Sequence, residues 1–128
     1  MATVLCVVVD PKARTVSVTS AGHLPLVMVH DGGSELLLPE VGLPIGVDPQ
    51  AHYTATTFTV PHGATLLGFT DGLVERHHET LDDGLARLCR VAAEVNGELE
   101  AMMAQILEQV RGTESVDDTA IAGIQWTK

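Results

Sequence analysis

The stretch ATLLGFTDGLVE, residues 64–75, is an apolar strand pattern that ends at a turn signal. Residues 64–70 are rich in the apolar and β-branched residues that strands favour. The acidic Asp71 then precedes a glycine, which lets the backbone turn sharply. The strand should therefore end here and leave the Asp71 carboxylate at the edge of a sheet.

Upstream of this strand, the sequence predicts further strands joined by short turns. The run TVLCVVV, residues 3–9, is continuously apolar, which predicts a strand buried on both faces. Other strands are expected at 15–20, 26–29, 35–38 and 53–60, with a hairpin turn at Asp31-Gly32-Gly33 and a loop at 42–49. Only residues 61–63 separate the strand at 53–60 from that at 64–70, which predicts a hairpin.

Downstream, the apolar period changes from two residues to about 3.6. This predicts a helix from about Asp82 to a glycine cap at Gly97, and a second helix over residues 98–111. A closing strand follows at 119–126. Strands, then two helices, then one strand predict an α+β fold of antiparallel sheet layers rather than a parallel nucleotide-binding sheet.

Composition excludes some classes of partner. The 128-residue chain has a formal net charge of -10 with only seven Lys and Arg residues, which argues against nucleic-acid binding and fits either cation binding or solubility. The apolar runs are too short to cross a bilayer. Cys6 and Cys89 lie in apolar runs without metal-ligand spacing, so we expect buried free thiols and a cytoplasmic protein.

Acidic residues stand at the ends of two predicted strands. Asp71 follows one strand, and Asp117 and Asp118 precede the last one. If these strands are neighbours, the carboxylates converge and could hold a hard cation such as Mg²⁺ or Mn²⁺. The spacing alone favours the simpler interpretation, an ordinary turn at Asp71-Gly72 and a solvated loop at Asp117-Asp118. The His77-His78 pair lacks a third ligand at zinc spacing and is read as loop.

Four segments, in order, resemble the signature stretches of the sporulation stage II protein E type of bacterial phosphatase, a branch of the protein phosphatase 2C superfamily. The segments are SAGHLP (20–25), GLPIGV (42–47), TDGLVE (70–75) and DDT (117–119). The resemblance implies an α-β-β-α sandwich with two Mn²⁺ or Mg²⁺ ions at one end of the sheets. It assigns metal ligation to Asp71 and Asp117 with Asp118 as their neighbour, and a supporting role in the loop to Gly72 and Glu75.

The resemblance also implies a substrate, a phosphoserine or phosphothreonine protein such as an anti-anti-sigma factor, and hence a role in sigma factor regulation. The family's N-terminal Gly-Asp and Gly-His-Gly, whose aspartate bridges both metals, have no counterpart in this chain. We therefore expect residues 1–128 to be a partial phosphatase domain, either a fragment of a longer protein or a non-catalytic interaction module. Self-association through Val4 to Val9 is expected if the N-terminal half is missing.

Overall fold

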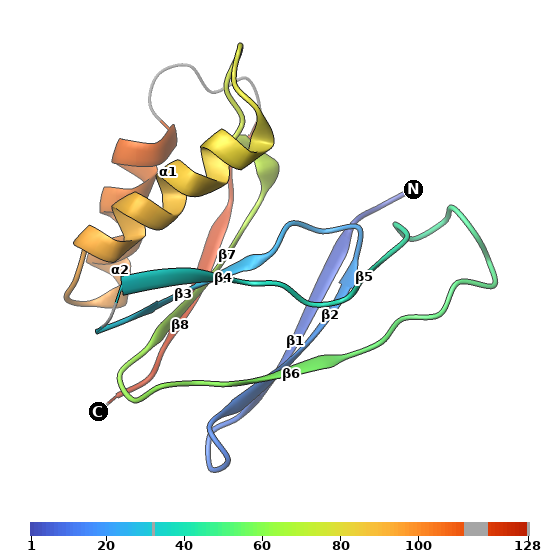
Figure 1. Ribbon diagram of the computed structural model, residues 1–128, viewed down its shortest axis with the longest axis horizontal. Helices are drawn as coiled ribbons and strands as arrows, with labels where there is room; N and C mark the ends of the chain where they lie inside the picture. The colour runs from blue at the N-terminus through green and yellow to red at the C-terminus, as the bar shows by residue number, and fades with distance from the viewer. Residues whose placement is uncertain (32, 112–117, 128) are drawn as a thin grey trace. The chain divides into compact units, whose positions relative to one another are not determined.

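The computed structural model describes residues 1–31, 33–111 and 118–127, which divide into two compact units. Unit 1 comprises Met1–Pro25 and Leu37–Pro61, and unit 2 comprises Leu26–Leu36 and His62–Lys128. Each unit is thus assembled from two separate stretches of chain and carries its own sheet (Figure 1).

The sheet of unit 1 is built around β2 (Thr15–Ala21). On one side, β1 (Val4–Asp10) pairs with it antiparallel along its whole length. On the other side, β6 (Thr56–Thr59) pairs antiparallel with its first half, and the short β5 (Val41–Gly42) pairs parallel with its end. The β1–β2 hairpin that the sequence predicts is therefore present.

The prediction that the first strand is buried on both faces is wrong. Side chains of β1 alternate between exposed and half-buried, with Val4 45 % and Val8 63 % exposed. Cys6 lies on the same exposed face, so its expected burial is also wrong. The alternation shows that, within the described residues, only one face of β1 is packed, because successive strand side chains point to opposite faces.

The sheet of unit 2 has the strand order β4-β3-β7-β8. Its members are β3 (Leu26–His30), β4 (Gly33–Leu37), β7 (Thr65–Phe69) and β8 (Ile121–Gln125). The central strand β7 pairs antiparallel with both β3 and β8, and its Leu67 is completely buried. The hairpin expected between residues 53–60 and 64–70 is absent, because β6 and β7 belong to different sheets.

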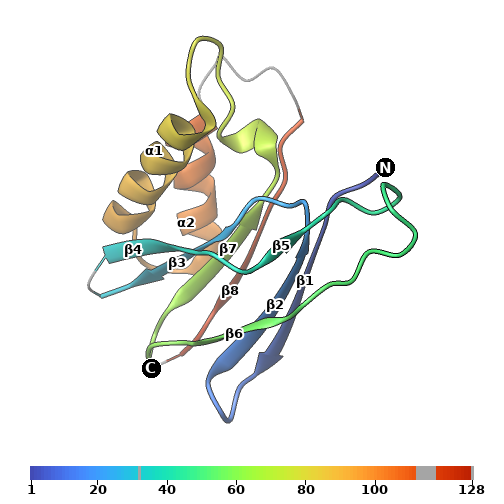
Figure 2. The same ribbon diagram turned by 45° about the vertical axis from the view of Figure 1, so that its right-hand side comes forward.

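Two helices cover one face of this second sheet (Figure 2). Helix α1 (Leu81–Glu94) begins with a capping box between Thr80 and Asp83, which satisfies two backbone N–H groups of the first turn. It ends at Glu94 with Val95 as its C-cap, so the glycine cap predicted at Gly97 is wrong, although the φ of Gly97, 103°, suits glycine. Helix α2 (Leu99–Ile106) continues into a π-helical turn, η2 (Leu107–Arg111), and buries Met102, Ile106 and Val110.

The α+β class, with antiparallel sheets and two helices in the second half of the chain, is confirmed. In the described part of the chain, no helix is both long and apolar enough to span a membrane.

Candidate functional site

The end of β7 turns directly into a short 3-10 helix, η1 (Asp71–Leu73). The Asp71 carbonyl oxygen accepts hydrogen bonds from the N–H groups of Val74 (3.0 Å) and Glu75 (2.9 Å), which fix this turn. Leu73 and Val74 are completely buried and anchor it, while the Asp71 side chain is exposed. The sequence thus places the carboxylate at the sheet edge, as predicted, with buried residues holding its backbone.

The beginning of β8 lies beside this turn. Thr70 N–H donates to the Ala120 carbonyl oxygen over 3.0 Å, and Ala120 N–H donates to Thr70 Oγ1 over 2.9 Å. Arg111 Nε donates to Thr119 Oγ1 over 2.9 Å, which ties the start of β8 to η2. The segment that carries the exposed Asp118 and the turn that carries Asp71 therefore meet at one edge of the sheet. Asp117 lies outside the described residues.

Aspartate oxygens at such an edge are the ligand type that Mg²⁺ and Mn²⁺ prefer. Among the described residues there is no group of three or more His, Cys, Asp and Glu side chains that could hold a metal ion. His77 and His78 have ring centroids 6.3 Å apart in the loop after η1. Asp71 and Asp118 therefore do not form a metal centre together with other described residues.

Sequence reasoning did not anticipate an arginine network behind the turn. Arg87 is only 8 % exposed, although it lies on α1 beside the apolar residues of that helix. Its guanidinium contacts Glu79 and the Val74 carbonyl oxygen, and Arg76 Nη2 donates to the Val110 carbonyl oxygen over 2.8 Å. The sequence does contain a signal for it. Arg87 lies three residues after Gly84 and four before Val91, so it shares the buried face of α1 with them.

The other two signature segments meet each other within unit 1. Ser20 and Ala21 pair with Val41 and Gly42. Gly22 has a φ of 69°, and a Cβ there would lie 2.6 Å from Pro44 Cγ, so glycine is required by both conformation and space.

His23, within the first of these segments, has a local structural role. Its backbone N–H donates to Ser20 Oγ over 3.1 Å, and its ring Nδ1 lies 2.8 Å from the Leu24 carbonyl oxygen. The His23 backbone and ring are thus both held by contacts within this segment.

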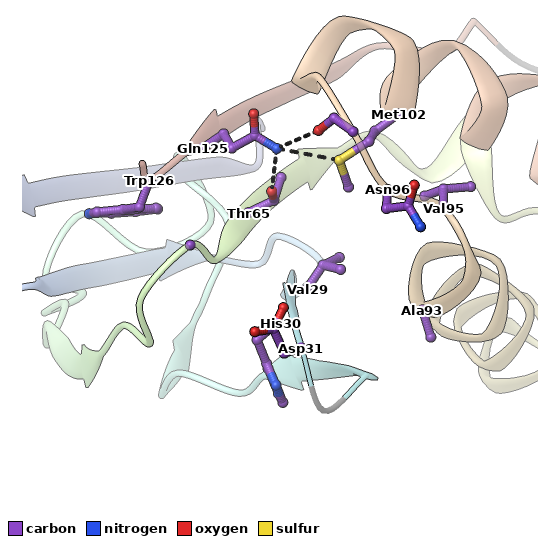
Figure 3. Close-up of a pocket in the computed structure, with 12 residues that line it drawn as sticks. Val29, His30, Asp31, Thr65, Ala93, Val95, Asn96, Met102, Gln125 and Trp126 are labelled. Carbon is purple, nitrogen blue, oxygen red and sulfur yellow. Dashed lines mark hydrogen bonds between the residues drawn. The ribbon is translucent and has the colours of Figure 1, made fainter. Parts of the chain in front are cut away.

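A separate cavity of about 410 Å³ lies at the opposite end of β7 from Asp71 (Figure 3). Gln125 Nε2 closes one side of it by donating to Thr65 Oγ1 and the Gly97 carbonyl oxygen, over 3.1 and 2.9 Å. Trp126 and Asn96 line other parts of its wall. The candidate metal ligands predicted from the sequence are not among the residues that line this cavity.

The model of the family described as stage II sporulation protein E (SpoIIE) matches residues 1–127. The chain belongs to the SpoIIE family. The matched range contains all four signature segments, SAGHLP, GLPIGV, TDGLVE and DDT, in that order.

One known protein is similar to this chain in sequence, and solved structures are similar to it in fold. Over 79 residues the chain is 28 % identical to Protein IcfG of Synechocystis, covering 62 % of this chain and 12 % of that protein. A crystal structure of RsbU and RsbW domains from Mycobacterium tuberculosis superimposes with a TM-score of 0.80 at 21 % identity, covering 93 % of this chain and 34 % of the other.

The manganese-soaked phosphatase domain of SpoIIE from Bacillus subtilis gives a TM-score of 0.68 at 14 % identity, covering 98 % and 56 % of the two chains. The fold is therefore that of protein phosphatase 2C-type domains. This SpoIIE family chain spans little more than half of that solved domain and a smaller part of the other two relatives.

Proposed function

We propose that this chain contributes to a metal-dependent phosphatase that acts on phosphoserine or phosphothreonine in a regulatory protein. The observation that carries the proposal is the hydrogen bonding between Thr70 and Ala120, which holds the Asp71 turn beside the segment that contains Asp118. Membership of the SpoIIE family supports the reaction class.

The donor chemistry at this edge fits Mn²⁺ or Mg²⁺, since aspartate offers hard oxygen ligands. Asp71 and Asp117 are the proposed ligands and Asp118 their neighbour. Ions held there would activate water and neutralise phosphoryl oxygens. The chain itself orients Asp71 by the backbone hydrogen bonds of η1, while Gly72 and Glu75 complete the turn.

A phosphorylated regulatory protein of the anti-anti-sigma type is the proposed substrate. The relative from Mycobacterium tuberculosis contains both an RsbU and an RsbW domain, which supports a regulatory context of this kind. The net charge of -10 favours a substrate surface with basic residues around the phosphorylated position.

The test measures Mn²⁺ binding and phosphate release from a phosphoserine protein by the purified chain. Asp71→Asn should abolish Mn²⁺ binding because the amide has lost the negative charge. Asp82→Asn, on the exposed first turn of α1, is the matched control and should bind Mn²⁺ like the unmodified protein. Equal binding by both variants would contradict the assignment of Asp71.

A non-catalytic interaction module is the second candidate. It is favoured by the departure from the family pattern, since the chain has no Gly-Asp segment upstream of TDGLVE that matches the family's bridging aspartate. Such a module would bind the phosphorylated protein in an isothermal titration without releasing phosphate. A phosphatase would release phosphate in a reaction that depends on Mn²⁺.

A further inference from the structure

We propose that Arg87 is a positioning residue that restrains the Asp71 turn from its buried side. This inference rests on the proposed role of Asp71 as a metal ligand. Arg87 Nη1 donates to both carboxylate oxygens of Glu79 over 2.8 Å. Arg87 Nη2 donates to the Val74 carbonyl oxygen over 3.2 Å. One guanidinium therefore holds both ends of the segment 74–79.

Val74 connects the hydrogen bonds of Arg87, called here the arginine clamp, to the candidate site. Its N–H donates to the Asp71 carbonyl oxygen, and its side chain is completely buried. Its own carbonyl group lies against Gly84 of α1, where an added Cβ would be 3.1 Å from Val74 Cβ. The carbonyl is thus enclosed between Gly84 and Arg87, so movement of the turn would break the arginine contact or push against the helix.

Arginine suits this position for geometric reasons. Its planar guanidinium places two nitrogens in fixed directions, and here the two nitrogens serve two different acceptors. Lysine keeps the positive charge but offers a single nitrogen, which cannot occupy both places. A carboxylate partner within hydrogen-bonding distance also compensates part of the cost of burying the arginine charge.

For the candidate site, the consequence is that the Asp71 backbone is held in one position. A metal ligand has to be held within a fraction of an ångström of its working position, and residues behind the ligand provide that restraint. Asp71 is exposed and lies on a three-residue turn, so its restraint has to come from the buried side of that turn. Arg87 supplies it without contacting the metal edge itself.

The experiment combines hydrogen exchange with Mn²⁺ binding for Arg87→Gln and Arg87→Lys in the full chain. Both variants should accelerate exchange at the N–H groups of residues 73–75 by about tenfold, since a hydrogen bond to a charged group contributes roughly that factor. Exchange in β7 should stay unchanged. Mn²⁺ affinity should fall by a similar factor, and lysine should not restore it.

Arg90→Gln is the matched control, because Arg90 is an exposed residue of the same helix, and it should alter neither measurement. If Arg87→Gln does not fold, Glu79→Gln weakens the clamp from the other side and should loosen the same amides to a smaller degree. Glu79→Gln then decides the inference by the same criteria.

Three results would overturn the inference: unchanged exchange at residues 73–75, equal acceleration throughout unit 2, or a loosened turn with unchanged Mn²⁺ affinity. Failure of the unmodified chain to bind Mn²⁺ would instead contradict the proposed function. The exchange measurement would still decide whether Arg87 fixes the turn.

Discussion

Replacing Gly84 by alanine should destabilise the protein, although alanine is the better helix former. Gly84 lies in the first half of α1 and is buried. A Cβ added there would fall inside the contact distance of the Val74 carbonyl oxygen, and 3.0 Å from the Val74 carbonyl carbon. The obstacle is backbone, so it cannot rotate away as a flexible side chain would, and the turn or the helix has to move.

The magnitude follows from two opposing terms. Overpacking costs about 1 to 3 kcal/mol, and a rigid obstacle belongs in the upper part of that range. The gain in helix propensity from glycine to alanine is about 1 kcal/mol. The net loss should be about 1 to 2 kcal/mol, which for a chain of this size lowers Tm by roughly 4 to 8 °C.

Thermal unfolding followed by circular dichroism measures this change. The control is Ala86→Gly on the exposed side of the same helix, where only propensity is altered and the loss should be about 1 kcal/mol. An increase in Tm for Gly84→Ala would refute the argument, because it would show that the close approach of Val74 to α1 is absent in solution.

Two further predictions concern the cysteines and the exposed strand. Burial raises the pKa of the Cys89 thiol, against a smaller lowering by its hydrogen bond with Ser34. Exposed Cys6 should therefore react with iodoacetamide first, and alkylation of Cys89 should need a higher pH. Burial of the protonated Cys89 thiol contributes fully to the free energy of unfolding below the ordinary pKa of the thiol. This contribution is lost as the pH rises above that pKa, which urea unfolding at increasing pH checks. The chain should self-associate at micromolar concentration in sedimentation experiments, and Val8→Lys should shift it toward monomer. Val8 is 63 % exposed on a strand that, among the described residues, has a strand partner on one side only. A monomeric unmodified chain would contradict this.

Local sequence signals located most elements. The change of apolar period near residue 82 identified α1, and the structure adds that Thr80 and Asp83 form its capping box. The helix ends at Glu94, three residues before the predicted glycine cap at Gly97. These signals are reliable because they depend on residues close in sequence, whose hydrogen bonds and periodicity are set by local geometry.

Pairing between strands was harder to predict. The short link Pro61-His62-Gly63 suggested a hairpin, yet it connects strands of two different sheets. Likewise, the apolar run from Val4 to Val9 suggested a strand buried on both faces, but β1 exposes one face. Both errors have one cause: composition reports how apolar a strand is, whereas its neighbours come from distant parts of the chain.

The candidate site, too, was predicted from the sequence only in part. Asp71 was located from the strand and glycine around it, and the edge it shares with Asp118 follows from the pairing of β7 with β8. The close position of Asp71 and Asp117, expected to be within about 6 Å of each other as ligands of one cation, stays a prediction. Arg87 escaped notice because its role depends on Val74 and Glu79, which contact it only in the folded chain.

The assembly of each unit from two separate stretches affects the order in which the protein folds. The chain crosses between the units three times, after Pro25, Leu36 and Pro61. During synthesis, all strands of unit 1 are available once Pro61 has emerged. By contrast, β7 can pair early with β3 but waits for its second partner, β8, sixty residues further on, where Gln125 pairs with Thr65. Pairing at such separation slows folding because a long loop has to close first. Until β8 arrives, the largely buried strand β7 has one unpaired edge, so a nascent or C-terminally truncated chain is prone to aggregate there.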